Sequence, residues 1–284
     1  MRLVNRSRIF NVQFRIFKLM SQSLVVNAGE IKWDTPVIIE HSPQELIIEI
    51  GENTSVTFLE LVSRGQYLSH KRILKAAPHS KVRFIRLQVL PTTSELEESL
   101  ISYVEKGAMV DCFSLHFGGF SVQSTIQQIG LGAQATCNTT LLAYARNEQQ
   151  MQFNFSHHYQ KQKGLGEIIA KGIADDRAKL GFHGIIRMDQ TASGTDSSLK
   201  QAILNISPDT KVSSTPELKI DTNDVKASHG ASIVNLNDSD LFYMQSRGIP
   251  IDDLRRMLTR GFLKTAITPL SDLPEVLKKI YTFI

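Results

Sequence analysis

The sequence predicts a mainly β protein that ends in a small helical domain. Short runs of β-branched, aromatic and aliphatic residues, bounded by Gly, Pro, Asn or Ser, recur between residues 36 and 234. The long amphipathic segments that alternate with strands in a doubly wound α/β sheet do not recur there. Near residue 235 the hydrophobic period changes from that of strands to that of helices. We therefore expect a basic N-terminal arm (1–35), a β core (36–234) and a C-terminal helical domain (235–284).

The β core is predicted to consist of many short strands. They are expected at 36–40, 45–50, 56–62, 81–90, 108–117, 120–126, 139–145, 150–155, 167–170, 182–188, 201–206, 217–220 and 231–234. Residues 94–106 are the best candidate for a short helix between the strands. Periodicity alone leaves a sandwich, a barrel and a β-solenoid open. The polar corners favour stacked rungs, although no hexapeptide or nonapeptide repeat is present.

Three short helices are expected in the C-terminal domain, because capping and stop residues follow one another closely there. They run from Asn237–Asp240 to Gly248, from Pro250 to Gly261, and from Ser271 onwards. In the second helix, acids lie in the first turn and arginines lie towards the end, which matches the helix dipole. Short amphipathic helices are marginal on their own, so they must dock on the β core or on a partner.

The net charge of +4 is concentrated in the N-terminal arm. Residues 1–29 contain five basic residues and no acid, which leaves the rest of the chain slightly acidic. A basic face for nucleic-acid binding is therefore not expected on the β core. The arm has three interpretations: an organelle-targeting or membrane-surface segment, an irregular terminus, or sequence upstream of a true start near Met20.

Cysteine usage and hydropathy indicate the compartment. No apolar run reaches the roughly 18 residues that a membrane-spanning helix needs. Cys112 and Cys137 form no CxxC motif, and no convincing signal peptide precedes them. This usage is typical of a reducing compartment without a disulfide framework. We expect the cytoplasm, or the stroma of an organelle if the basic arm is a targeting segment.

Sequence motifs for several kinds of chemistry are missing. No P-loop, GxSxG, HExxH or EF-hand pattern occurs. Gly164-Leu165-Gly166 lacks the third glycine and the preceding strand of a dinucleotide-binding motif. Asp175-Asp176-Arg177 and Asp189 lack the second carboxylate, two residues away, that a polysaccharide-acting β-helix enzyme would need.

Histidines and cysteines offer few metal ligands. His157 and His158 point to opposite faces if they lie on a strand, and a surface or corner pair is expected. Cys112 and His116 would share a face but lie roughly 13 Å apart, so packing roles are expected for both. His229 lies at the border between β core and helices, where it either faces a cleft or an interface or has a structural role.

The same border region carries a family resemblance. Four segments resemble the C-terminal signature of the SufB/SufD family, the scaffold proteins of the Suf iron–sulfur cluster assembly system: Lys226–Ser232, Leu241–Tyr243, Ser246–Ile249 and Arg260–Phe262. The resemblance extends over residues 165–264. It implies a right-handed parallel β-helix (β-solenoid) followed by a small C-terminal α-helical domain. SufB-type chains carry a glutamate directly after the motif histidine, and here Gly230 holds that position, so the chain resembles SufD.

The resemblance also implies partners and site residues. A SufD-like chain is a non-enzymatic scaffold subunit of a SufBCD complex. It pairs with SufB through the β-helix and binds the ATPase SufC through its C-terminal helices. The expected SufC-binding residues are Leu241, Phe242, Tyr243, Arg247, Gly248, Ile249, Leu258, Gly261 and Phe262. His229 is the expected cluster-assembly residue at the SufB interface and the one expected metal ligand.

No cofactor is expected to bind stably, whereas a transient iron–sulfur cluster or iron atom is expected at the SufB–SufD interface. Ala227 stands where many SufD chains carry a cysteine, so thiolate ligands would come from elsewhere. The family's N-terminal helical domain is mostly missing from the sequence. The alternatives are a polysaccharide-acting β-helix enzyme, a divergent scaffold without cluster chemistry, and a membrane-surface protein acting through residues 1–29. Neither nucleic-acid binding nor a membrane span is expected.

Overall fold

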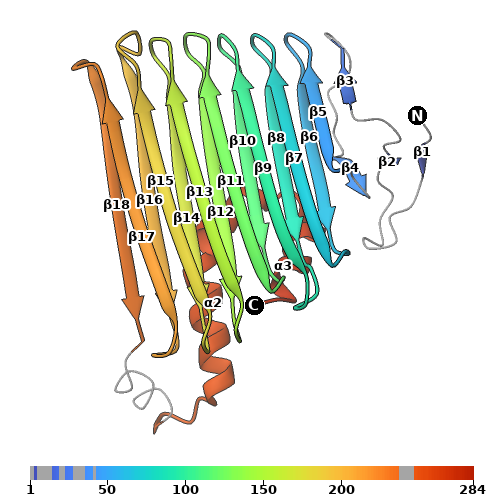
Figure 1. Ribbon diagram of the computed structural model, residues 1–284, viewed down its shortest axis with the longest axis vertical. Helices are drawn as coiled ribbons and strands as arrows, with labels where there is room; N and C mark the ends of the chain where they lie inside the picture. The colour runs from blue at the N-terminus through green and yellow to red at the C-terminus, as the bar shows by residue number, and fades with distance from the viewer. Residues whose placement is uncertain (1–2, 5–14, 19–22, 28–35, 41–42, 237–245) are drawn as a thin grey trace.

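The computed structural model describes residues 3–4, 15–18, 23–27, 36–40, 43–236 and 246–284. Its strands alternate between two facing sheets, so the chain winds as a parallel β-solenoid (Figure 1). The eight-stranded sheet contains β3 (Ser23–Val26), β5 (Glu45–Ile50), β7 (Tyr67–Ala76), β9 (Glu95–Val104), β11 (Ser121–Gly130), β13 (Gln150–Tyr159), β15 (Lys179–Met188) and β17 (Lys211–Ile220). The ten-stranded sheet contains β1 (Leu3–Val4), β2 (Arg15–Lys18), β4 (Val37–Glu40), β6 (Ser55–Val62), β8 (Lys81–Gln88), β10 (Met109–His116), β12 (Thr136–Ala145), β14 (Leu165–Ala174), β16 (Thr195–Asn205) and β18 (Val225–Asn235).

Each coil contributes one strand to each sheet, and the turns between the strands also stack. One turn position has a positive φ in successive coils, and its N–H donates to a carbonyl of the next coil at 2.6 to 3.1 Å: Asn53, His79, Gly107, Gln134, Lys163 and Gly194. At Gly107 a Cβ would lie 2.6 Å from His79 Nδ1, so the close approach of the two turns requires glycine there. The repeated turn keeps the coils in register.

The solenoid interior is the main hydrophobic core. Inward side chains alternate with outward ones along each strand, as in β13, where Met151, Phe153 and Phe155 are buried. Phe182 of β15 lies edge-to-face with both Phe153 and Phe155, with ring centroids 5.9 Å apart in each pair. Aromatic packing of this kind fills the space between the sheets.

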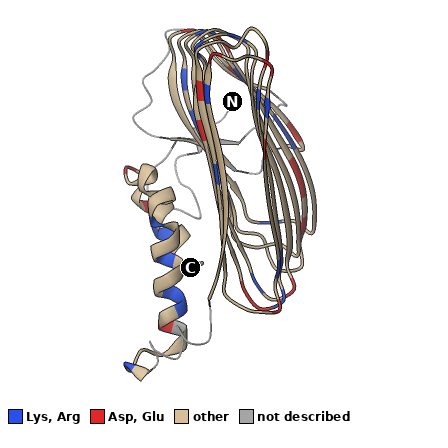
Figure 2. Cartoon of the chain, turned by 90° about the vertical axis from the view of Figure 1, so that its left-hand side faces the viewer, with Lys and Arg blue, Asp and Glu red and all other residues tan. Residues whose placement is uncertain are grey.

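A second core lies outside the solenoid. Helix α2 (Ile251–Ile267), the 3-10 helix η1 (Thr268–Leu270) and helix α3 (Pro274–Tyr281) lie along the outer face of the ten-stranded sheet (Figure 2). Leu263 and Ile280 of the helices are buried together with Phe113 and Leu115 of β10. The sheet is therefore apolar on both faces where the helices cover it. None of the helices in the described part of the chain is both long and apolar enough to span a membrane.

The expected parallel β-solenoid with C-terminal helices is confirmed, but one predicted helix is a strand. Residues 94–106 contain β9. Leu96, Leu100 and Val104 recur every four residues and so imitate a helical face, because polar side chains occupy the inward positions between them. The pairing of β9 with β7 and β11 decides the conformation.

The predicted end of the second helix at Gly261 is wrong. Helix α2 continues to Ile267, because Leu263 and Ile267 are buried in the second core and their packing outweighs the low helix propensity of glycine. The arginines of α2 therefore lie in its N-terminal half and its middle, so their predicted match to the helix dipole is wrong, whereas Asp253 in the first turn and Lys264 in the last turn do match it. The third predicted helix is confirmed as α3, which begins at Pro274. The first lies mostly outside the described residues.

The domain boundaries at 35 and 234 remain a prediction. Strands β2 and β3 lie within the predicted arm, where β2 pairs with β4 and β3 pairs with β5. Described parts of residues 1–35 are thus continuous with the two sheets.

Candidate functional site

The last coil of the solenoid is open. Strands β17 and β18 end their sheets, and within the described residues each has a parallel neighbour on one side only. The side chains of β18 are mostly exposed, and Ile220, Ile233 and Val234 are exposed by 37%, 42% and 48%. Strand edges with unpaired backbone groups and apolar side chains favour pairing with another strand. This open end is a candidate interface.

His229 lies on β18 in the row of side chains that faces the solenoid interior. Its register partner on β16 is Leu199, which is fully buried. Ala227 packs against the interior core two residues earlier, so strand alternation places His229 on the same face. No further coil of the described chain covers this face, and the His229 side chain is exposed. Gly230 has no neighbour within 4 Å of the position of a Cβ. The site therefore offers one accessible imidazole between small residues.

The chain does not surround His229 with further metal ligands. No group of three or more His, Cys, Asp or Glu side chains in the described residues is placed to hold a metal ion. Cys112 and Cys137 are both buried, and burial raises the pKa of the Cys112 thiol to about 12 and the pKa of Cys137 still further. Neutral thiols are poor metal ligands, which agrees with the packing role expected for Cys112.

His157 and His158 point to opposite faces of β13, as predicted. His158 Nε2 lies 2.8 Å from Asp189 Oδ1 on the outer face. His157 is fully buried, so the expected surface or corner pair is wrong for this residue. Its Nε2 lies 2.9 Å from Thr139 Oγ1, and burial lowers the pKa of His157 to about 3. His157 is therefore a neutral interior imidazole.

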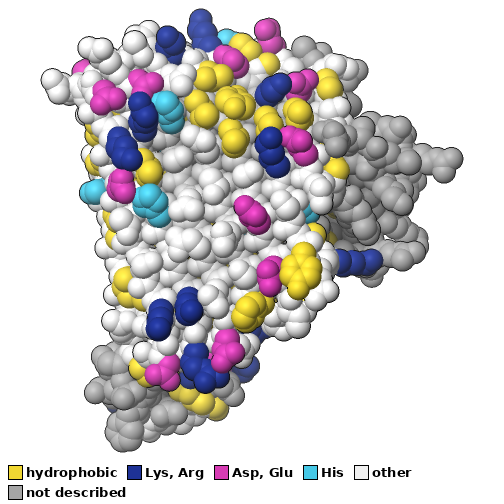
Figure 3. Space-filling model, viewed as in Figure 1, with side chains coloured by type: hydrophobic (Ala, Val, Ile, Leu, Met, Phe, Trp, Pro, Cys, Tyr) yellow, Lys and Arg dark blue, Asp and Glu magenta, His cyan; other side chains and the backbone are white. Residues whose placement is uncertain are grey.

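The outer face of the eight-stranded sheet carries a group of polar side chains over its C-terminal strands (Figure 3). His183 Nε2 lies 2.8 Å from Glu217 Oε1, and Lys219 Nζ lies 3.4 Å from Glu217 Oε2. The hydrogen bond from His183 lowers the pKa of Glu217. Both contacts are partly exposed, and contacts of this kind contribute little to stability.

The carboxylates considered for polysaccharide chemistry do not share a site. Asp175 and Asp176 lie in the turn before β15, and Asp189 follows the other end of that strand. A strand of this length separates its ends by roughly 30 Å. Ser207 Oγ donates to Asp175, and the Asn147 N–H donates to Asp176 at 2.8 Å, which gives both carboxylates structural partners in stacked turns.

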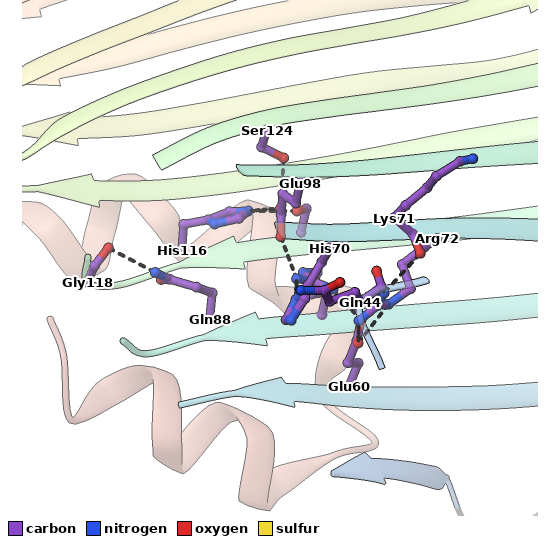
Figure 4. Close-up of polar contacts among 12 residues, drawn as sticks. Gln44, Glu60, His70, Lys71, Arg72, Gln88, Glu98, His116, Gly118 and Ser124 are labelled. Atoms are coloured by element: carbon purple, nitrogen blue, oxygen red, sulfur yellow. Dashed lines mark hydrogen bonds and ion pairs between the residues drawn. The ribbon is translucent and has the colours of Figure 1, made fainter. Parts of the chain in front are cut away.

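A charged cluster lies inside the solenoid near its N-terminal coils (Figure 4). Glu60 of β6 accepts hydrogen bonds from Arg72 Nε at 2.9 Å and from Arg72 Nη2 at 2.7 Å, and its other oxygen accepts from Arg86. Arg86 Nη2 lies 2.6 Å from Glu98 Oε2. All four side chains are at least nine-tenths buried. Two acids and two arginines leave the cluster without net charge, as buried ions require.

Two histidines complete this cluster. Arg86 Nη2 donates to His70 Nδ1 at 2.7 Å, and His116 Nε2 lies 3.5 Å from Glu98 Oε1. Burial lowers the pKa of both imidazoles to about 4. Burial alone would raise the pKa of Glu98, but Arg86 holds it below its usual value. The sequence pattern alone did not predict this cluster. Its signal is a charged residue at an inward position of an apolar strand, such as Glu60 between Phe58 and Val62.

The residues expected to bind a partner ATPase fall into three groups. Leu241, Phe242 and Tyr243 lie outside the described residues. Arg247 and Gly248 are exposed and Ile249 is half-buried, just before α2. On α2 itself, Leu258 and Phe262 pack against the second core, whereas Gly261 is exposed and has no neighbour within 4 Å of the position of a Cβ. The exposed part of this set is therefore Arg247, Gly248 and Gly261.

The fold and the site define a parallel β-solenoid protein with an open last coil and helices packed on one sheet. The family model for the SUF system FeS cluster assembly SufBD core domain matches residues 37–262. The chain therefore belongs to the SufB/SufD family of iron–sulfur cluster assembly proteins, and its similarity to SufD proteins makes it SufD-like.

Several curated proteins are similar to parts of this chain. The chain is 29% identical to the iron–sulfur cluster assembly protein SufD of Bacillus subtilis over 133 residues, which are 47% of this chain and 30% of that protein. It is 28% identical to protein ABCI7, chloroplastic, of Arabidopsis thaliana over 206 residues, 71% of this chain and 40% of that protein. It is 33% identical to SufD of Escherichia coli over 104 residues, 37% of this chain and 25% of that protein. The matched segments span less than half the length of these relatives.

Proposed function

We propose that this chain is a non-enzymatic, SufD-like scaffold subunit that supports iron–sulfur cluster assembly together with a SufB-type scaffold and a SufC-type ATPase. The observation that carries the proposal is the open last coil, in which an exposed imidazole continues an interior row of side chains. Membership of the SufB/SufD family supports the class of reaction. The cytoplasm or an organelle stroma is the proposed compartment.

The open end supports pairing with a second β-solenoid. The unpaired edges of β17 and β18 lie next to each other and present two rows of backbone donors and acceptors. Ile220, Ile233 and Val234 supply apolar area at the same end. A partner that also ends in two parallel strands would form hydrogen bonds with the backbone groups of both edges at once. A globular surface without strand edges would not. We expect this form in a SufB-type solenoid, which shares the family core domain.

His229 is the proposed contribution of this chain to the chemistry. An imidazole can ligate iron, and the place of His229 on the open coil would put it at the boundary between the two scaffolds. Ala227 and Gly230 offer no ligand atoms in their side chains, and the two thiols are buried. The remaining ligands of a nascent cluster would therefore come from the partner, and the cluster is a transient cargo.

The C-terminal helices are the proposed contact with the ATPase. Arg247, Gly248 and Gly261 present an exposed surface before and along α2. Leu258 and Phe262 connect the same helix to the ten-stranded sheet through the second core. A force applied to α2 would therefore be transmitted to the strands. An ATP-driven movement of the SufC-type ATPase could in this way move the open coil.

Co-purification from the native host tests this proposal. A tagged SufC-type ATPase should recover this chain together with a second, SufB-type chain, identified by mass spectrometry. Deletion of residues 246–284 should release the ATPase. Recovery of the ATPase without this chain, under conditions where the SufB-type chain is retained, would contradict the proposed complex.

A further inference from the structure

A small cleft lies between α2, the turn after β12 and the C-terminal segment. Its volume is about 280 Å³. Four arginines line it, together with two tyrosines: Arg146, Arg255, Arg256, Arg260, Tyr144 and Tyr281. No acidic side chain of the described residues lines the cleft. The convergence of four guanidinium groups in so small a space makes the cleft electropositive.

The arginines of the cleft are only partly neutralised. Arg256 pairs with Asp253 one helical turn away, and Arg255 lies 3.8 Å from Asp175. For Arg146 and Arg260 the described contacts are with aromatic rings and backbone. Arg260 Nε donates to Ile284 O at 3.3 Å, and its guanidinium lies 5.6 Å from the centre of the Tyr281 ring. Four guanidinium groups face Asp253, Asp175 and the carboxyl group of Ile284, the last residue of the sequence, so the cleft keeps a small surplus of positive charge.

Arg255 carries an unused donor. Its Nε is buried and has no hydrogen-bond partner in the described part of the chain, although the side chain as a whole is 39% exposed. A buried donor without an acceptor costs free energy, and a donor on a charged group costs more. An anion in the cleft would supply acceptors both for this N–H and for the terminal nitrogens of the neighbouring guanidinium groups.

The position of the arginines on α2 also needs a counter-charge. Arg255 and Arg256 lie in the second turn of a helix that starts at Ile251, close to its positive end. Cations are favourable at the other end of a helix and unfavourable here. The packing of α2 on the sheet does not require them, because Leu254, Leu263 and Ile267 make the buried contacts.

We propose that this cleft binds a phosphate-class oxyanion, either inorganic phosphate or the phosphate group of a small ester. Planar guanidinium groups match the oxygen spacing of phosphate and donate in pairs. Tyr144 and Tyr281 frame the opening and would contact the organic part of an ester. The cleft is separate from the open coil and from His229, but it lies on α2, the proposed contact with the ATPase.

Titration calorimetry of the full chain at low ionic strength tests the site, with sodium phosphate and adenosine 5′-monophosphate as probes. Phosphate should bind at one site per chain, and chloride at the same ionic strength should not. Tighter binding of the monophosphate would identify an ester as the ligand, and equal or weaker binding would identify the free ion. Affinity should fall at least about tenfold in the double variant Arg255→Gln/Arg260→Gln, which loses two charged donor groups.

Two further variants keep the result interpretable. Arg146→Gln changes only an exposed turn residue of the cleft and should weaken phosphate binding without affecting the fold, as checked by circular dichroism. Arg64→Gln removes the same charge from an exposed position outside the cleft and should leave affinity unchanged. The absence of phosphate binding in the wild-type chain, or equal weakening by Arg64→Gln, would overturn the proposal. Arg146 lies outside α2, so co-purification of Arg146→Gln with the ATPase reports on the scaffold role separately from phosphate binding.

Discussion

His229 on β18 pairs in register with Leu199 on β16, so an exposed imidazole occupies the position that a fully buried leucine holds one coil earlier. A solenoid that simply ended would be expected to cap this row with a polar turn or a helix. Here the row continues as an open strand, and its last described inward positions include Ala227, His229 and Ile233. The end of the solenoid thus combines an exposed imidazole, which can ligate a metal, with exposed apolar side chains, which are unfavourable in water.

His229→Ala should reduce cluster assembly without changing stability. Because the side chain is exposed, its loss should alter the free energy of unfolding by no more than about 0.5 kcal/mol. The measurement is the activity of an iron–sulfur enzyme in cells that depend on this chain, together with the chemical denaturation of the purified protein. His183→Ala, which removes a partly exposed imidazole from the outer face of β15, is the matched control. Equal activity of the two variants would remove His229 from the proposed site.

Ile233→Lys should prevent pairing of the open coil while the chain still folds. A lysine on an unpaired edge strand opposes the approach of a second strand, since its charge would be buried in the new interface. Recovery of the SufB-type partner on affinity purification should fall, with an unchanged far-ultraviolet spectrum. Val25→Lys makes the same change at an exposed position near the other end of the eight-stranded sheet. A partner lost equally from both variants would point to a general effect of charge.

Glu60→Gln should destabilise the fold strongly. The substitution leaves Arg72 and Arg86 buried inside the solenoid with one carboxylate between them, and breaking a buried ion pair in this way costs about 3–5 kcal/mol. Urea denaturation should show the loss as a lower midpoint. The comparison is Glu45→Gln, which breaks the exposed pair with Lys71 and should cost at most about 1 kcal/mol. Similar costs for the two variants would contradict a charge-balanced interior cluster.

Stability should fall as the pH is lowered from 6.5 towards 4.5. Burial lowers the pKa of His70 and His116 from 6.5 to about 4 and that of His157 to about 3. Below pH 6.5 the unfolded chain takes up protons at these imidazoles and the native chain does not. The free energy of unfolding therefore decreases with falling pH, by up to about 1.4 kcal/mol per pH unit for each histidine.

The histidines set the slope over the upper part of this window, because carboxyl groups with a lowered pKa, such as Glu98, add to it only as the pH approaches 4.5. Urea denaturation from pH 7.5 to pH 4.5 should show the slope. His157→Gln can keep a hydrogen bond to Thr139 but does not titrate, so its slope should be smaller than that of the wild type. An unchanged slope in this variant would mean that His157 is accessible to protons in the native state.

The solenoid could be expected from the sequence only in part. Its coils repeat the same backbone positions, but the residue types at those positions differ from coil to coil. One interior row of the ten-stranded sheet reads Phe58, Phe84, Cys112, Thr139, Ile168, Leu199 and His229. Cores require apolar volume and not particular residues, so the coils can diverge while the stacking persists. Most of the strands from residue 36 onwards were predicted, because alternation and turn residues are local signals, but β7 was not among them and a helix was predicted in place of β9. Parallel stacking is not a local property.

His229, the charged interior cluster and the arginine cleft could be predicted from the sequence to different extents. His229 was identified through its family resemblance and not through its chemistry, since a single histidine before a glycine has no distinctive spacing. The charged interior cluster was missed because Glu98 interrupts the strand alternation of β9 and so makes it resemble a helix. The arginine cleft depends on the contact of α2 with the turn after β12, which no local pattern in the sequence reports.

Gly261→Ala should stabilise the protein, because Gly261 lies in the interior of α2 and not at its end. An alanine there has space, since no atom lies within 4 Å of the new Cβ, and the backbone has no positive φ. Alanine should raise the free energy of unfolding by about 0.5–1 kcal/mol through its higher helix propensity. Thermal denaturation followed by helical circular dichroism measures the effect. A loss of stability would mean that the helix stops at this glycine in solution. If stability rises and binding of the ATPase falls, the exposed surface at Gly261 is in contact with the partner, since the added methyl group then obstructs only the complex.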